Sequence, residues 1–160
     1  MTQFEIIATV EKISEQYLIP ALEQLITAFP FNIISFHSDN DSEYVNKKVA
    51  SLLEKLRIGF TKSRARHSND NGLAEGKNAA VVRKTFGKGY IDQKQANKIN
   101  QFNRDVLNVY VNYHRPCYFP IVLVDEKDKQ RKKYKLRDMM TPYDKLKSLE
   151  GTKLYLKNIE

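Results

Sequence analysis

The sequence predicts a mixed α/β fold in a single compact domain. Short segments rich in β-branched residues alternate with longer segments whose apolar residues keep helical spacing, which is the pattern of strands and helices that share one core. The length of 160 residues suits one domain and is enough to bury one hydrophobic core. The sequence shows no internal repeat and no low-complexity linker.

Three short segments are predicted strands. FEIIATV (4–10) is rich in β-branched residues, and NIISFHS (32–38) is partly β-branched and lies between Pro30 and an acidic cluster. RIGFTKS (57–63) is the third predicted strand, and a polar loop follows it.

Four helices are predicted, over residues 11–29, 45–56, 73–86 and 92–113. Pro20 implies a kink or a late start in the first of them. Asp92 opens the last one, with Gln95 three residues on, as in a capping box. On the last two helices we expect the following residues to face inward: Ala79, Val82, Phe86, Ile99, Phe102, Val106, Val109 and Tyr113.

The C-terminal part has a different character. YFPIVLV and RKKYKLR flank the charged turn DEKDKQ, which predicts a β-hairpin. Thr141 and Pro142 resemble a helix start, with Thr at the cap and Pro in the first turn.

The charge is distributed unevenly between the two halves. Residues 1–75 hold 8 basic and 10 acidic side chains, whereas residues 76–160 hold 19 basic and 9 acidic ones. An excess of cations in one half is typical of a polyanionic partner, nucleic acid before a membrane surface, although a solvated Lys-rich face is the alternative.

The cysteine count and the hydropathy indicate a cytoplasmic protein that does not bind membranes. Cys117 is the one cysteine, and no Cys/His cluster has zinc spacing. No apolar run is long enough to span a bilayer, and the N-terminus resembles no secretion or anchor signal.

A cluster of carboxylates follows the second predicted strand. Asp39 falls at its carboxyl end, which is where ligands gather in α/β sheets, and Asp41 and Glu43 follow closely. Carboxylates tolerate such proximity when a divalent cation lies between them. The alternative is that Asp39 and Asp41 cap the next helix.

A second acid, Glu75, is separated from Asp39 by 35 intervening residues and lies at the start of a predicted helix. With it, the segments HSDNDSEYVN, TKSRARHSNDNGLAEGKN, VVRK and YVNYHRPC together resemble the integrase core of bacterial insertion-sequence transposases, which is related to retroviral integrases. The resemblance extends through almost the whole chain. It implies a ribonuclease-H-like fold in which three carboxylates hold two divalent ions, Mg²⁺ or Mn²⁺, for DNA strand cleavage and strand transfer.

Carried over to this sequence, the resemblance assigns the second acid to Asp39 and the third to Glu75, as catalytic residues and metal ligands. Asn40 matches the Asn of the family's Asp-Asn-Gly, but Asp41 replaces its Gly. An aspartate there adds negative charge beside the metal ions and adopts the backbone conformation of glycine less easily.

The first acid of the family has no counterpart before Asp39. In the family it lies on the central strand, upstream of the strand that residues 4–10 resemble, and Glu5 lies within that edge strand. We therefore expect a core that lacks its first two strands, with a partial integrase core over 1–115 and a basic extension over 116–160 that holds the hairpin and a helix.

DNA, as transposon ends and target, is the expected partner, and self-association is left open. Cations that follow the two acids are predicted to hold its phosphates: Lys62, Arg64, Arg66, Lys77, Arg83 and Lys84. The alternative is a catalytically inactive transposase remnant that only binds DNA or oligomerises. An unrelated α/β module is the third hypothesis.

Overall fold

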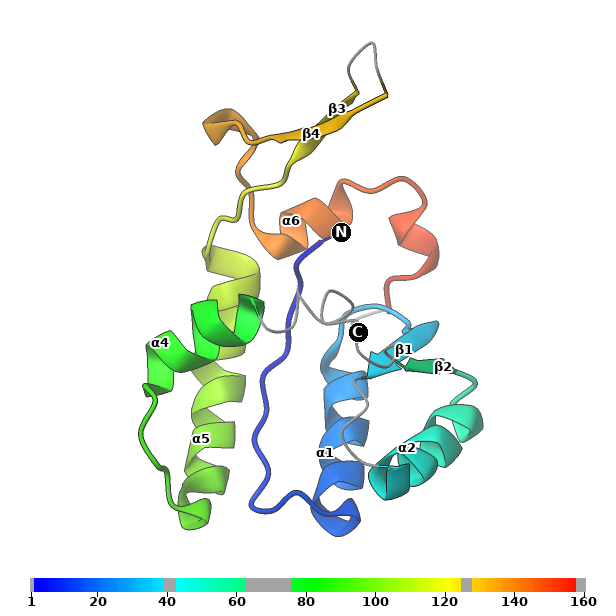
Figure 1. Ribbon diagram of the computed structural model, residues 1–160, viewed down its shortest axis with the longest axis vertical. Helices are drawn as coiled ribbons and strands as arrows, with labels where there is room; N and C mark the ends of the chain where they lie inside the picture. Colours follow the sequence, from blue (N-terminus) through cyan, green and yellow to red (C-terminus); the bar gives the residue numbers. More distant parts are fainter. Residues whose placement is uncertain (1, 39–42, 63–75, 125–127, 158–160) are drawn as a thin grey trace. The chain divides into compact units, whose positions relative to one another are not determined.

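The computed structural model describes residues 2–38, 43–62, 76–124 and 128–157, and the side chains of these residues except 43–46. The chain is a mixed α/β protein, as predicted. It divides into two compact units (Figure 1): unit 1 comprises Met1–Ile6 and Gln101–Leu156, and unit 2 comprises Ile7–Asn100 and Lys157–Glu160.

Unit 2 is built on a strand, helix, strand arrangement preceded by a helix. Helix α1 (Glu15–Ala28) is followed by β1 (Ser35–Ser38), α2 (Glu43–Lys55) and β2 (Gly59–Lys62). The two strands pair in parallel, with Ser35 opposite Gly59 and Ser38 opposite Lys62. A parallel pair needs a long crossover, and α2 supplies it.

The core of unit 2 lies between α1, α2 and these strands. Its buried residues are Leu22, Val49, Leu52, Leu53 and Ile58, and half-buried side chains that include Phe36 and Phe60 pack against them. Helix α1 begins four residues later than the predicted start and keeps Pro20 inside it. The Lys157 ammonium donates to the carbonyls of Ile26 and Thr27, at 3.0 and 3.1 Å, and so satisfies part of the carboxyl end of α1.

The predicted strand 4–10 is wrong, because this segment forms neither strand nor helix. Asparagine side chains take the place of a neighbouring strand. In unit 1 Asn112 accepts from the Glu5 N–H at 2.9 Å and donates to the Glu5 carbonyl at 2.6 Å. In unit 2 Asn100 does the same for Thr9, at 2.8 and 2.9 Å. A carboxamide offers the same donor and acceptor pair as a peptide group, so it satisfies the backbone without a ladder.

The long predicted helix is confirmed within one residue, since residues 93–114 are helical throughout. It begins with a 3₁₀ turn (Gln93–Gln95) and continues as α5 (Ala96–Phe102), and it holds two π-helical stretches, Asn103–Leu107 and Tyr110–His114. Asp92 caps it as predicted, accepting from the Lys94 N–H at 2.8 Å.

The face that this helix buries is not the predicted one. Phe102, Val106 and Val109 are at least 39% exposed. From Asn103 onward the buried side chains are instead Asn103, Leu107, Asn108, Val111 and Asn112. The wider π turns shift the buried face along the helix. Asn112 on this face hydrogen-bonds Glu5 of the irregular N-terminal segment.

The helix predicted over 73–86 is confirmed for its described part, residues 76–86. Its middle, Asn78–Val82, is π-helical, and α4 (Arg83–Phe86) completes it. The inward face is again displaced, because Val81 is buried whereas Ala79 is exposed and Val82 and Phe86 are half-buried.

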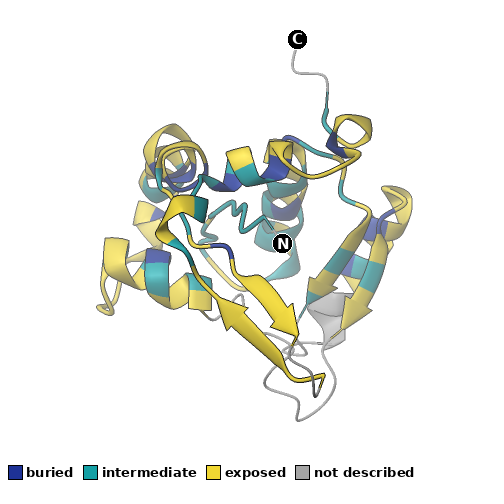
Figure 2. Cartoon of the chain, turned by 90° about the horizontal axis from the view of Figure 1, so that it is seen from above, coloured by how far each residue is buried: buried dark blue, intermediate teal, exposed yellow. Residues whose placement is uncertain are grey.

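Unit 1 contains the predicted hairpin and C-terminal helix. β3 (Ile121–Val124) pairs antiparallel with β4 (Gln130–Lys133), and both strands are exposed along their whole length (Figure 2). Helix α6 (Pro142–Lys147) has Pro142 at its first turn and Thr141 as its cap. The Thr141 hydroxyl accepts from the Asp144 N–H at 3.1 Å and donates to the Asp144 carboxylate at 2.7 Å.

Candidate functional site at the carboxyl edge of the sheet

The carboxyl ends of β1 and β2 lie side by side. Ser38 and Lys62 are register partners, so the two strands end at one edge of the sheet, about 4.8 Å apart. Residues 39–42 continue directly from Ser38, and residues 63–75 continue directly from Lys62. The segments that carry Asp39 and Glu75 therefore both leave the sheet from the same edge.

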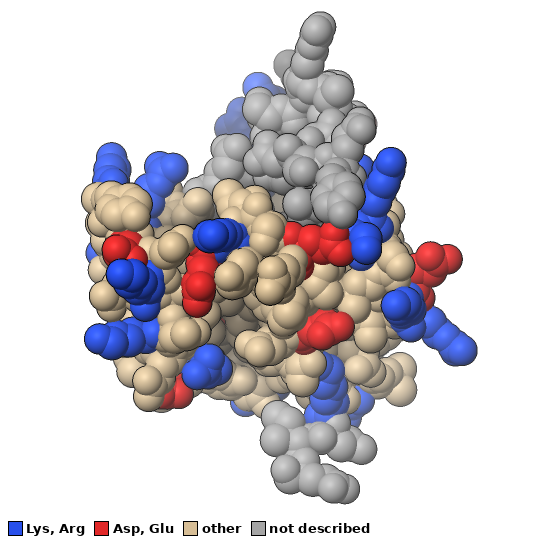
Figure 3. Space-filling model, turned by 90° about the horizontal axis from the view of Figure 1, so that it is seen from below, with Lys and Arg blue, Asp and Glu red and all other residues tan. Residues whose placement is uncertain are grey.

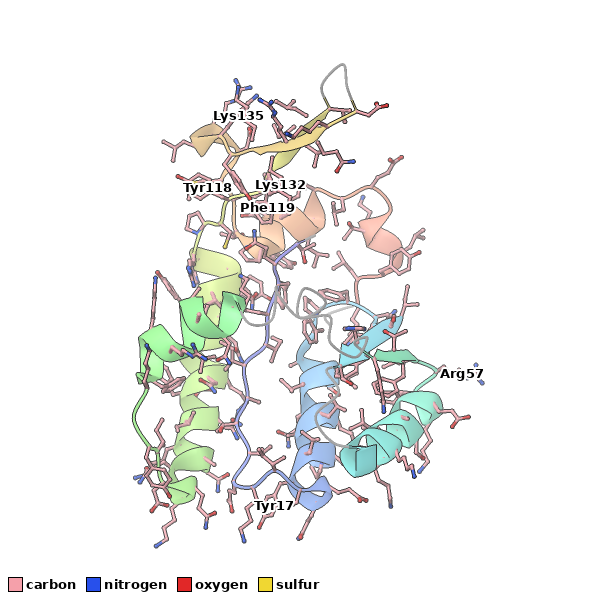
Figure 4. The ribbon with its side chains drawn as sticks, in the orientation of Figure 1. Tyr17, Arg57, Tyr118, Phe119, Lys132 and Lys135 are labelled. Atoms are coloured by element: carbon pink, nitrogen blue, oxygen red, sulfur yellow. The ribbon has the colours of Figure 1, made fainter. Side chains whose placement is uncertain are left out.

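A complete carboxyl-terminal cap on α2 sets the position of β2. The Arg57 N–H bonds the Glu54 carbonyl at 2.9 Å, and the Ile58 N–H bonds the Leu53 carbonyl at 2.8 Å. These two bonds form a Schellman motif, and Arg57 holds the left-handed position that glycine usually fills, with φ of 56°. Figure 4 shows the Arg57 side chain extending away from the sheet.

The last residues of the two strands also interact through side chains. The His37 Nδ1 and the Thr61 Oγ1 lie 2.9 Å apart across the register pair that these residues form. Phe36 and Phe60 stack at 6.2 Å on the face that packs on the core. Both contacts fix the ends of the two strands, of which β1 ends immediately before Asp39.

The predicted site residues fall partly within the described chain. Asp39, Glu75, Arg64 and Arg66 lie outside it, as does Asp41. Of the predicted cations, Lys62 is exposed at the end of β2. Lys77 is half-buried in the first described helical turn after Glu75, and Arg83 and Lys84 are exposed on α4.

The described residues contain no group of three His, Cys, Asp or Glu side chains arranged for a metal ion. This leaves the metal prediction for Asp39 and Glu75 as it stands, because neither residue is among them.

Two groups elsewhere have displaced pKa values. Burial and the neighbouring Tyr143 raise the pKa of Tyr113, and hydrogen bonds from Thr141 and Lys147 lower the pKa of Asp144.

A second cationic surface was not among the predicted DNA contacts. Residues 129–137 hold six Lys or Arg and no acid, and they include all of β4. Figure 4 shows two of them, Lys132 and Lys135, beside Tyr118 at the hairpin. In the sequence, the run RKKYKLR could have indicated this cationic surface. Elsewhere the charges are mixed: in the face drawn in Figure 3, described cations and anions are interspersed.

The fold and the site define a mixed α/β chain with a parallel β–α–β unit and a cationic second half. No family model matches the chain, and no solved structure matches it. A relative in Sinorhizobium fredii, "Uncharacterized protein y4rM", is 33% identical over 101 residues. That match covers 63% of this chain and 29% of the relative, which is more than twice as long.

Among the described residues, none of the helices has the length and hydrophobicity needed to cross a bilayer.

Proposed function

We propose that this chain is part of an integrase-type transposase core, which cleaves and joins DNA strands with divalent metal ions. The proposal combines the sequence resemblance with one structural observation. β1 and β2 are parallel and end in register at Ser38 and Lys62, so the segments bearing Asp39 and Glu75 start from one edge. In the ribonuclease-H-like fold that we propose, the metal ions lie at such an edge.

The donor set suits Mg²⁺ or Mn²⁺. Asp39 and Glu75 provide hard carboxylate oxygens, which these ions prefer, and Asp41 adds a third carboxyl close by. In this reading Asp39 and Glu75 would hold the ion, which would supply Lewis-acid polarisation of a phosphodiester and charge stabilisation of its leaving oxygen. Lys62 is the register partner of Ser38, which precedes Asp39, and Lys77 follows Glu75 by two residues, so both would position the DNA phosphates.

A second candidate function is DNA binding without catalysis. It is favoured by the excess of basic residues over 76–160 and by the cationic β4, neither of which contributes to metal binding.

The experiment supplies a labelled DNA end and Mn²⁺ to the purified chain and to a version extended upstream by a strand pair that carries an aspartate. We expect the extended version to nick or join DNA and the 160-residue chain to do so poorly, because a missing ligand spoils the geometry of in-line displacement. Glu75→Gln should abolish the activity of the extended version, whereas Glu54→Gln on α2 should leave it unchanged. Equal activity of the Glu75→Gln variant would overturn the proposed role of Glu75.

If neither version cleaves DNA but both bind it, the second candidate function stands. That binding should weaken steeply as salt rises, because it depends on phosphate contacts.

A further inference from the structure

The hairpin strand β3 exposes an unusual amount of apolar surface. Its four residues are consecutive apolar side chains that are 39% to 60% exposed: Ile121, Val122, Leu123 and Val124. Side chains alternate along a strand, so Ile121 and Leu123 lie on one face and Val122 and Val124 on the other. Both faces of the hairpin are therefore uncovered in the described chain.

Among the described elements, the hairpin has neither a third strand nor a face packed on another element. The two strands pack principally on each other among the described elements. An isolated two-stranded hairpin is marginal in water, and a third strand or a packed face is generally needed for stability. The free edge of β3 also presents unpaired backbone groups that another strand can use.

The two edges of the hairpin differ in charge, and this determines which one can accept a strand. β4 carries Arg131, Lys132 and Lys133 beside one another, whereas β3 carries no charge. Lysine on an edge strand is a common device against edge-to-edge pairing. The free edge of β3 is thus the one suited to strand addition.

We propose that β3 pairs antiparallel with β3 of a second copy of this chain, forming a four-stranded sheet with the two apolar strands at its centre. A two-fold axis through Val122 would place apolar residues opposite apolar residues, with the two Val122 side chains facing each other. The two cationic β4 strands would then be the outer edges. They lie three strand spacings apart, about 14 Å, which exceeds the Debye length of about 10 Å at 0.1 M salt.

A second copy fits this surface better than nucleic acid does. Nucleic acid would pair with the cations of β4 and leave the second edge of β3 without a strand, whereas a second β3 pairs that edge and places apolar side chains beside apolar ones. The cationic outer edges would also stop further addition, so that the assembly closes as a dimer. The dimer is expected to be weak, because four-residue strands bury less than the roughly 800 Å² per partner of a standard interface.

Sedimentation equilibrium over a range of protein concentrations tests the proposal. The wild-type chain, freed of nucleic acid by nuclease, should show a monomer–dimer equilibrium that persists as salt is raised from low to high, because the association is apolar. Val122→Glu should be monomeric, since two like charges would face each other near the axis. The new carboxylate lies opposite Lys132, so the hairpin itself should be retained.

Leu154→Glu is the matched control, because Leu154 is 81% exposed, belongs to unit 1 and lies outside the hairpin. This variant should dimerise as the wild-type chain does. Slower amide exchange of residues 121–124 at high protein concentration would place the contact on β3. The proposal is overturned if the wild-type chain stays monomeric throughout, if Val122→Glu dimerises equally well, or if association disappears at high salt, as a nucleic-acid bridge would.

Discussion

Two buried asparagines on the long helix should respond in opposite directions to the same substitution. Asn112 is 0% exposed, and its side chain makes three hydrogen bonds, two with Glu5 and one with the Asn108 carbonyl at 2.9 Å. Asn103 is 1% exposed, and neither its amide nitrogen nor its amide oxygen has a hydrogen-bond partner among the described residues. The pair separates the effect of hydrogen bonding from that of burial.

Asn112→Leu should lower the free energy of unfolding by about 3 kcal/mol, since each lost hydrogen bond is worth about 1 kcal/mol and the Glu5 backbone is left without its partner. Asn103→Leu should instead leave the free energy of unfolding unchanged or raise it, by up to about 1–3 kcal/mol, because it removes unpaired polar atoms from the interior. These differences are large against a total stability of about 5–15 kcal/mol.

Urea titration followed by circular dichroism measures both changes, and amide exchange at Glu5 locates the first. In Asn112→Leu the Glu5 amide should exchange faster than in the wild-type chain, and in Asn103→Leu it should not. Equal destabilisation by the two substitutions, with Glu5 protected in both, would refute the inference that an asparagine side chain replaces a neighbouring strand.

Three further outcomes are expected. Arg57→Gly should raise the free energy of unfolding by about 1 kcal/mol in a urea titration, because φ of 56° is strained for arginine and not for glycine. Hydrogen bonds from Thr141 and Lys147 lower the pKa of Asp144. The stability that the ionised Asp144 carboxylate gives α6 is therefore fully present above the ordinary carboxyl pKa, and it is lost as the pH falls through the lowered pKa. Carbon NMR titration of that carboxyl should show the lowered pKa, and Thr141→Ala should move it back toward normal. DNA binding by the whole chain should weaken steeply between about 50 and 200 mM salt with little dependence on base sequence, and a flat salt dependence in a titration would contradict phosphate contacts as its main source.

The order of elements could be predicted because each depends on short-range patterns. β-branched residues indicated β1 and β2, a stripe that includes Val49 and Leu52 indicated α2, and the Thr-Pro pair indicated α6. The segment 4–10 has the same β-branched composition but no ladder. A strand requires a partner, and the partners of Glu5 and Thr9 are side chains about a hundred residues away, which local composition does not reveal.

The buried faces of the later helices could not be predicted from a period of 3.6 residues. Their π-helical stretches change the period, and asparagines occupy interior positions that an apolar stripe does not mark. The asparagines at positions 100, 103, 108 and 112 of one helix could have indicated this polar buried face.

The strand ends that precede the candidate site were predictable in outline, whereas Asp39 and Glu75 lie outside the described residues. The position of Asp39 at a strand end follows from composition, and the parallel pairing of β1 with β2 places the departure of both acid-bearing segments at one edge. The cations of β4 were predicted as part of a hairpin, but their complete exposure depends on the absence of any covering element in the described chain. Local sequence does not encode that property.

Paramagnetic broadening by Mn²⁺ tests most directly whether Asp39 and Glu75 share a metal ion. The amides of Ser38 and Lys62 end the two strands at the candidate edge and serve as reporters. We predict that Mn²⁺ broadens both signals in the wild-type chain and in Glu54→Gln, and that Asp39→Asn and Glu75→Gln each remove most of the broadening. Broadening that persists in Glu75→Gln, or signals that stay sharp in the wild-type chain, would contradict a metal site formed by these two carboxylates.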